Sequence, residues 1–213
     1  MMMQAKICGI STPDALDAAI AGRASHVGFV FFGKSPRNIV MEQAAALAIR
    51  AAGRVRLVGL FVDPEANHVD AVRRQVPLDM IQLHGEESPA FVAQLGLASG
   101  LEVWKAIAIK TRDDLKAAEK FRGAANRILY DAKPVAGADL PGGTGMRFDW
   151  TLLEGHAHPL PWILAGGLDP ANAGEAVRMT RADFVDVSSG VESKPGIKDV
   201  DKIAAFLKAT SQL

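Results

Sequence analysis

Short apolar runs alternate with amphipathic stretches along the whole chain, and this alternation constrains the possible fold more than any other feature. A chain in which strands and helices alternate forms parallel strands joined by helical crossovers. Eight runs have the length and the apolar or β-branched content of strands: AKICGI (5–10), HVGFVFF (26–32), VRLVGLFV (55–62), DMIQLH (79–84), EVWKAIAI (102–109), RILYDA (127–132), WILAGG (162–167) and DFVDVSS (183–189). Eight such units in 213 residues predict a small (β/α)8 TIM barrel, an α/β fold with one domain spanning residues 1–213.

The stretches between the strands carry helix start and stop signals. In 12–23, Thr12 is a predicted N-cap and Pro13 a predicted first helical residue. The stretch 41–53 ends in Gly53, which suits the residue after a helix. The stretch 111–123 has acidic residues in its first turn and closes at Gly123, and 199–210 is the last predicted helix.

An open, doubly wound sheet is the alternative architecture for such a chain. That fold usually shows a GxGxxG fingerprint after its first strand, whereas this chain has CGIST there. The longest irregular stretch is KPVAGADLPGGTGMR (133–147), after the sixth predicted strand. A loop of this length inside a compact domain is often functional, so we expect it to serve the site.

Composition argues against several classes of partner. Lys and Arg number 24 and so do Asp and Glu, so no global field draws the chain to nucleic acid or to an anionic membrane. The sequence shows neither a signal peptide pattern nor an apolar run of membrane-spanning length, and we expect a cytoplasmic protein. Its five histidines lack the spacing of a zinc site, and His156 and His158 read as part of a solvated loop, so no metal is expected.

In a barrel of this kind the active site lies at the carboxyl ends of the strands, so polar residues there are candidates. Cys8 ends the first predicted strand, and Lys6 lies two residues earlier on the same strand face. A nearby cation favours the thiolate and would suit Cys8 to proton transfer. A free cysteine is also a common small buried hydrophobe, so position alone leaves both interpretations open.

Two further strand-end residues and one loop residue have similar alternatives. Asp131 closes the sixth strand, where it either serves the chemistry or caps or pairs with the following loop, for example through Lys133. Arg37 in GKSPRNI either grips a carboxylate in a bidentate pair or is a solvated loop residue. By position alone, His84 in QLHGEE is more typical of a structural residue than of a catalyst.

Two glycine-containing turns follow the seventh and eighth strands. LAGGLDPAN and DVSSGVES offer backbone N–H groups at the place where barrels frequently bind phosphate. Glycine lets a phosphate oxygen approach the backbone closely. The pair of turns predicts a phosphate site, with ordinary turn chemistry as the alternative.

Taken together, the motifs resemble those of the phosphoribosylanthranilate isomerase family. They run in the family's order from Lys6 to Asp199: KICGI, GFVFFGKSPRNI, LVGLFV, IQLHGEE, GGTGMRFDW, LAGGLDPAN and VDVSSGVESKPGIKD. The resemblance implies a small (β/α)8 barrel of tryptophan biosynthesis that performs an Amadori rearrangement without metal or organic cofactor. The implied substrate is N-(5′-phosphoribosyl)anthranilate, and the implied product is 1-(2-carboxyphenylamino)-1-deoxyribulose 5-phosphate. We expect a monomer or a homodimer.

The resemblance also implies roles for individual residues. Cys8 falls on the family's general base and Asp131 on its general acid, while Arg37 falls on the arginine that meets the anthranilate moiety and His84 on a histidine near the substrate. The family's phosphate site falls on Gly166, Gly167, Ser189 and Gly190.

One position departs from the family pattern. Met146 stands where the family often has lysine after the GGTG turn, and Arg147 follows it as a possible substitute. Two alternatives to the isomerase remain at this point. A related barrel such as the synthase that closes the indole ring would use lysine and glutamate instead, and a non-catalytic phosphate binder would need neither Cys8 nor Asp131.

Overall fold

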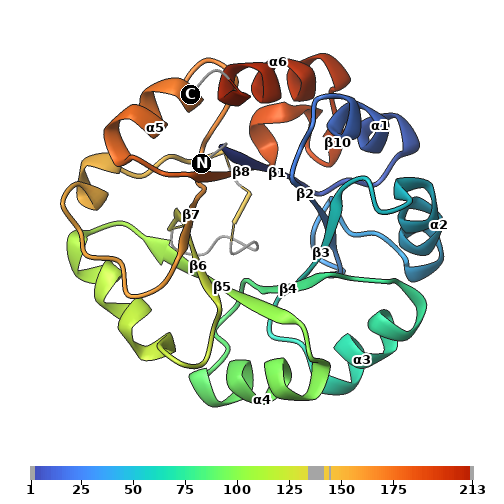
Figure 1. Cartoon of the computed structure of the whole chain (residues 1–213), viewed down its shortest axis with the longest axis horizontal. Helices are drawn as coiled ribbons and strands as arrows, with labels where there is room; N and C mark the ends of the chain where they lie inside the picture. The colour runs from blue at the N-terminus through green and yellow to red at the C-terminus, as the bar shows by residue number, and fades with distance from the viewer. Residues whose placement is uncertain (1–2, 134–141, 144, 212–213) are drawn as a thin grey trace.

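A computed structural model describes residues 3–133, 142–143 and 145–211. Eight parallel strands follow one another in chain order and close into a barrel, and the helices lie around the outside of this ring (Figure 1). The strands are β1 (Gln4–Cys8), β2 (His26–Val30), β3 (Arg56–Phe61), β4 (Met80–Leu83), β5 (Glu102–Ile109), β6 (Arg127–Ala132), β7 (Trp162–Leu164) and β8 (Phe184–Val187). This confirms the predicted (β/α)8 fold, and each predicted strand run overlaps one strand of the barrel.

Helical segments connect the strands, although two crossovers use 3-10 helices instead of α-helices. The α-helices are α1 (Pro13–Ala21), α2 (Met41–Ala51), α3 (Ala66–Gln75), α4 (Pro89–Ser99), α5 (Ala173–Thr180) and α6 (Val200–Ser211). The 3-10 segments are η1 (Arg112–Phe121), η2 (Trp150–Leu153) and η3 (Ser189–Val191). Between η3 and α6 lies a short antiparallel hairpin of β9 (Glu192–Lys194) and β10 (Ile197–Lys198).

The helix boundaries follow the local signals in the sequence. The Thr12 side chain accepts a hydrogen bond from the backbone N–H of Ala15 at 3.4 Å, so it caps α1 as predicted. Helix α2 ends at Ala51, and it is followed by Ala52 in the left-handed region and by Gly53 with a φ of 71°. Most of the irregular stretch 133–147 lies outside the described residues. Among the described helices, none is both long and apolar enough to cross a membrane.

Apolar side chains fill the barrel interior below the carboxyl ends of the strands. This interior cluster consists of Val58, Met80, Trp104, Ala106, Leu129, Ile163, Ala165 and Phe184. A larger apolar cluster packs between the strands and the surrounding helices. Because both layers are filled, space for a ligand is left at the carboxyl ends of the strands, where the sequence predicted the site.

Candidate active site

A cavity at the carboxyl ends of the strands brings the predicted site residues together. Of the eight residues proposed from the sequence, seven line it: Cys8, Arg37, His84, Asp131, Gly166, Gly167 and Ser189. They come from strand ends and loops spread around the barrel, so closure of the sheet is what gathers them. The eighth residue, Gly190, is not among the described lining residues and packs against the turn after β7, where an added Cβ would collide with the backbone carbonyl of Leu168.

Cys8 ends β1 and lies at the bottom of the cavity, where it is 4% exposed. A Cβ at Gly28 of the neighbouring strand would lie 2.9 Å from the Cys8 Sγ, so glycine at this position leaves room for the thiol. The hydroxyl of Ser188 donates a hydrogen bond to the Cys8 carbonyl oxygen at 3.1 Å and ties the end of β1 to the end of β8. The thiol is therefore both buried in the wall and open to a ligand in the cavity.

Lys6 lies beneath Cys8 as an ion-paired cation. Its Nζ donates to Asp186 Oδ1 at 2.9 Å, and the lysine side chain is fully buried. Burial lowers the pKa of Lys6, but the charges of Asp186 and Cys8 outweigh this and leave the pKa above its ordinary value. A permanent positive charge therefore lies beneath the thiol, as the spacing of Lys6 and Cys8 suggested.

The protonation of Cys8 differs from the simple expectation drawn from Lys6. Burial raises the pKa of the Cys8 thiol above its ordinary value, and the attraction of Lys6 opposes this shift without cancelling it. Asp186 adds a smaller contribution that also favours the neutral thiol. The resting residue is thus mainly a thiol, and Lys6 limits the cost of forming the thiolate.

Asp131, the penultimate residue of β6, has both carboxylate oxygens engaged. Oδ1 accepts from the backbone N–H of Ala132 at 2.8 Å, and Oδ2 lies 3.1 Å from His84 Nε2. The alternative partner considered from the sequence, Lys133, pairs instead with Asp114 at 3.6 Å. The carboxyl group of Asp131 is therefore oriented toward the cavity and coupled to His84, which the sequence alone left without a definite role.

Two glycines cover the contact between Asp131 and His84. A Cβ at Gly142 would lie 2.5 Å from Asp131 Oδ2 and 2.7 Å from His84 Nε2. A Cβ at Gly166, whose φ is 82°, would lie 3.1 Å from Asp131 Oδ1. The backbone of both glycines thus packs directly against the Asp131 carboxyl group. A larger residue at either position would displace that carboxyl group.

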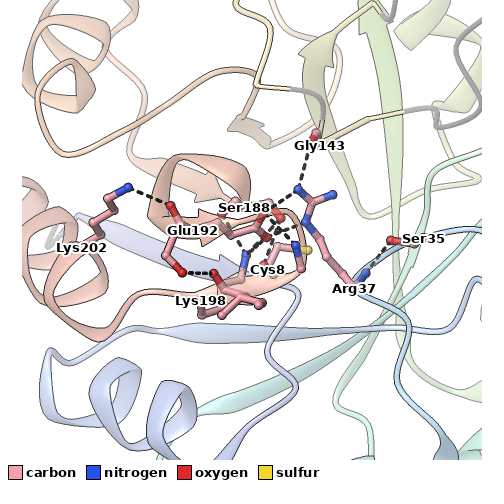
Figure 2. A network of polar contacts seen from close by, with 11 residues as sticks. Cys8, Ser35, Arg37, Gly143, Ser188, Glu192, Lys198 and Lys202 are labelled. Atoms are coloured by element: carbon pink, nitrogen blue, oxygen red, sulfur yellow. Dashed lines mark hydrogen bonds and ion pairs between the residues drawn. The ribbon is translucent and has the colours of Figure 1, made fainter.

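Arg37 is held by an acidic residue from the hairpin that follows β8 (Figure 2). Its Nε donates to Glu192 Oε1 at 2.7 Å, and its Nη2 donates to Glu192 Oε2 at 2.9 Å and to the Gly143 carbonyl at 2.9 Å. The bidentate edge predicted to hold a substrate carboxylate is therefore occupied by Glu192. The Nη1 edge of Arg37 lies beside Gly143, where an added Cβ would be 2.6 Å away.

Lys198 completes this buried ion network. Lys198 ends β10, and its Nζ donates to Glu192 Oε1 at 2.8 Å and to the Ser188 carbonyl at 2.9 Å (Figure 2). Burial raises the pKa of Glu192, but hydrogen bonds and charge from Arg37 and Lys198 outweigh this and hold it below its ordinary value. Burial lowers the pKa of Lys198, an effect that Glu192 opposes. The network fixes Arg37 at the cavity wall.

The two turns proposed for phosphate lie side by side at the cavity. Gly167 and Ser189 both line it, and their backbone N–H groups meet no acceptor within the described ranges of the chain. Asn172 Nδ2 donates to the Gly167 carbonyl at 2.9 Å and so fixes the turn after β7. The arrangement offers backbone donors from two neighbouring loops to one anion.

The structure shows whether Arg147 replaces the lysine that the family often has at position 146. Met146 lines the cavity and is 41% exposed. Arg147 instead lies over the Trp150 ring, with its Cζ 5.1 Å from the ring centroid, and it is not among the described residues that line the cavity. Arg147 therefore does not supply the missing charge in this arrangement.

Sequence reasoning missed four buried residues that support the site: Gln82, Asp186, Glu192 and Lys198. Two of them had a usable signal, because Gln82 precedes His84 by two residues and Asp186 precedes Ser188 by two, which places each pair on one strand face. Glu192 and Lys198 follow the last barrel strand in a hairpin, where no periodic pattern marks them. Within the described residues, no group of three or more His, Cys, Asp or Glu side chains is arranged to hold a metal ion.

Comparison with known proteins agrees with this geometry. The family model for N-(5'phosphoribosyl)anthranilate (PRA) isomerase matches residues 5–209. A curated relative from Paramagnetospirillum magneticum, named N-(5'-phosphoribosyl)anthranilate isomerase, is 53% identical over 209 residues, which are 98% of this chain and 97% of the relative.

Solved structures show the same similarity. One describes monomers of the dimeric phosphoribosylanthranilate isomerase from Thermotoga maritima and superposes with a TM-score of 0.86 at 35% identity over all of both chains. Another is a phosphoribosyl anthranilate isomerase in complex with reduced 1-(o-carboxyphenylamino)-1-deoxyribulose 5-phosphate, with a TM-score of 0.86 at 34% identity and the same full coverage. Fold, site geometry and sequence thus agree, and the chain belongs to the N-(5'-phosphoribosyl)anthranilate isomerase family.

Proposed function

We propose that this chain isomerises N-(5′-phosphoribosyl)anthranilate to 1-(2-carboxyphenylamino)-1-deoxyribulose 5-phosphate in tryptophan biosynthesis, with Cys8 as general base and Asp131 as general acid. The observation that carries the proposal is their placement in one cavity: the thiol comes from β1 and the carboxyl group from β6, which do not pair with each other. A sugar held between them meets a base and an acid at separate atoms.

Ring opening requires a proton on the furanose oxygen. Asp131 gives its proton to this oxygen while the bond from that oxygen to C1′ breaks, and the lone pair of the anthranilate nitrogen forms the C1′=N bond of an iminium ion. The Ala132 N–H and the contact with His84 hold the Asp131 carboxyl group at the cavity for this step.

The second step forms the enolamine. The Cys8 thiolate removes the proton from C2′, the C2′–H electrons form the C1′=C2′ bond, and the C=N electron pair returns to nitrogen. The C2′ hydroxyl then loses its proton while C1′ gains one, and the ketone results. Lys6 compensates the negative charge of the thiolate before it takes the proton from C2′.

Two anchors orient the sugar between Cys8 and Asp131. The turns at Gly167 and Ser189 bind the phosphate through backbone N–H groups. The Nη1 edge of Arg37, its outer edge away from Glu192, binds the anthranilate carboxylate. Orientation of this kind supplies several kcal/mol of the barrier. The direct test is turnover of freshly generated phosphoribosylanthranilate, followed as loss of anthranilate-type fluorescence. Binding of the product analogue without any turnover would contradict the proposal and leave a non-catalytic phosphate binder.

Replacement of Arg37 by lysine tests the carboxylate anchor. Arg37→Lys keeps a charge but cannot bond to both Glu192 oxygens and also present an outer edge to the ligand. We expect KM to rise about tenfold, the effect of losing one charge-assisted hydrogen bond, with the Kd for inorganic phosphate unchanged in calorimetry. An equal loss for inorganic phosphate would place Arg37 at the other end of the substrate.

Replacement of Gly167 tests the phosphate anchor. Its φ is 68°, and a Cβ there would lie 2.7 Å from the Met146 carbonyl oxygen, so Gly167→Ala distorts the turn. We expect a loss of about 1–2 kcal/mol in the free energy of unfolding and clearly weaker phosphate binding in calorimetry. Gly33→Ala is the matched control, because its Cβ would enter open space in a loop at the same end of the barrel. Unchanged phosphate binding in Gly167→Ala would remove this turn from the site.

Assembly and location extend the proposal. We assign residues 1–213 to one (β/α)8 domain that works in the cytoplasm as a monomer or a homodimer; the Thermotoga maritima relative is described as dimeric. Light scattering of the purified chain distinguishes the two assemblies.

A further inference from the structure

A buried glutamine lies behind the acid and is not used by the mechanism above. Gln82 of β4 is fully buried and is not among the described residues that line the cavity. Its Nε2 lies 3.2 Å from His84 Nδ1, and its Oε1 is buried without a hydrogen-bond partner in the described part of the chain. With the 3.1 Å contact between His84 Nε2 and Asp131 Oδ2, these side chains form a relay from the barrel interior to the acid.

The two ends of a carboxamide have nearly the same shape, so Gln82 fits this position in two orientations with opposite consequences. When Nε2 faces His84, it donates to Nδ1, the histidine proton is on Nε2, and the Asp131 oxygen it meets is an unprotonated acceptor. When Oε1 faces His84, it accepts from Nδ1–H, and the bare Nε2 accepts from a protonated Asp131. The second state holds one proton more than the first.

We propose that Gln82 is a positioning residue for the general acid: its Oε1, turned toward Nδ1–H of His84, stabilises the state in which Asp131 carries the proton for the sugar ring. We call this the loaded state; its two protons are on His84 Nδ1 and Asp131 Oδ2. The other orientation, with Asp131 unprotonated, is the unloaded state. Once Asp131 has given its proton to the ring oxygen, one proton remains, on His84 Nδ1; the unloaded state forms when Nε2 takes up a proton from solvent, Nδ1 releases its own to solvent, and the amide turns its Nε2 to Nδ1. The difference is the single proton that ring opening consumes, so the two states balance.

Glutamine suits this task because it offers both a donor and an acceptor without a charge. In either orientation one end of the amide contacts His84 and the other faces the interior. In the unloaded orientation Oε1 is the buried end without a partner in the described part of the chain, and in the loaded orientation Nε2 takes that place. A glutamate here would only accept, and a methionine would do neither. The identity of residue 82 therefore controls which proton state of the acid is favoured.

Charged groups near His84 and Asp131 also influence the proton that Asp131 carries, and the variants below leave these groups unchanged. They come from every side of the relay: Cys8 and Lys6 of β1, Arg37 after β2, Asp63 after β3, Asp186 of β8, and the ion pair of Lys105 with Glu87. Because none of these residues changes in the variants below, a shift in pH dependence reports on position 82.

The test is the pH profile of kcat for three variants of the full-length chain. Gln82→Glu favours the loaded state, so the alkaline fall of kcat moves up by about one pH unit or more. Gln82→Met removes the acceptor, so that fall moves down by about one unit, and kcat at pH 8 drops about tenfold with KM within about twofold. Met80→Leu is the control, because Met80 lies two residues earlier in the same strand, inside the apolar interior cluster. It leaves the shape of the profile unchanged.

Several outcomes would overturn the inference. Equal losses of kcat at every pH in both Gln82 variants would show a merely structural role. If the alkaline fall of kcat moved to lower pH in Gln82→Glu and to higher pH in Gln82→Met, the assigned orientation of the amide would be reversed. The inference rests on the proposed function, and the two fail differently: an inactive parent chain removes the function, whereas an active parent whose Gln82 variants keep the parent profile removes only the relay.

A spectroscopic measurement covers the case in which Gln82→Glu does not fold. In chain labelled with ¹⁵N-histidine, the ring nitrogen shifts distinguish the two tautomers, and His84→Asn assigns the signal. The parent should show the Nδ1–H form of His84 below the alkaline fall of kcat and the Nε2–H form above it. Gln82→Met should show the Nε2–H form throughout. The Nε2–H form at every pH in the parent would rule the relay out.

Discussion

Cys8→Ser is expected to lower kcat by at least about 100-fold, the scale for losing a general base. Serine has nearly the same size, so it fits the space that Gly28 leaves beside the thiol, and the fold should be retained. Its hydroxyl ionises far less readily than a thiol, so the charge of Lys6 cannot make it an effective base at neutral pH. Steady-state turnover measures the loss, and calorimetry with the product analogue should show nearly unchanged binding.

The pH dependence gives a second measurement on the same residue. Because burial raises the pKa of the Cys8 thiol, the thiolate is a minor form at neutral pH. Its fraction grows about tenfold with each pH unit below that pKa. The parent kcat/KM should therefore rise with pH on the acidic side of its optimum, and Cys8→Ser should lose that rise. Near-normal turnover in the variant would exclude Cys8 as the base.

Asp131→Asn is expected to reduce kcat by about 10²–10⁴-fold with substrate affinity largely retained. Asparagine keeps the shape of the carboxyl group and can still accept from the Ala132 N–H, so the end of β6 should stay in place. It has no acidic proton to give to the ring oxygen. Steady-state kinetics should show the loss in kcat and not in KM.

A matched carboxylate makes this result specific. Asp183 lies just before β8, at the amino end of the strand and on the surface, so Asp183→Asn changes the same functional group at the opposite end of the barrel. Turnover of that variant should equal that of the parent. If Asp131→Asn raised only KM, Asp131 would bind the substrate without acting as the acid.

Much of the fold could be predicted from local sequence pattern. The eight strands and the cap at Thr12 follow from periodicity and from residue chemistry within a few positions along the chain. The sequence predicts a helical segment over 111–123, and the structure has the tighter 3-10 geometry at Arg112–Phe121. Its pattern marks the turn positions but does not distinguish the two helix types over so short a stretch.

The candidate site was predictable only in part. Strand-end position identified Cys8 and Asp131 as candidates, and the family resemblance gave them roles. The partner of Arg37 could not be found in this way, because Glu192 lies 155 residues further along the chain. The correction matters, since Glu192 occupies the arginine edge that had been reserved for the substrate. The same holds for Arg147, which stacks on Trp150 instead of entering the cavity.

The sequence by itself determined the alternation of strands and helices, the end of the barrel that carries the chemistry and the family to which the chain belongs. These properties follow from residues close together in the chain, whose spacing is the same before and after folding. Tertiary structure alone decided which carboxylate pairs with which cation, that burial raises the pKa of the Cys8 thiol despite Lys6, and that His84 joins Gln82 to Asp131. Those properties depend on distances across the closed barrel and on the exclusion of water, and both arise only when the eighth strand pairs with the first.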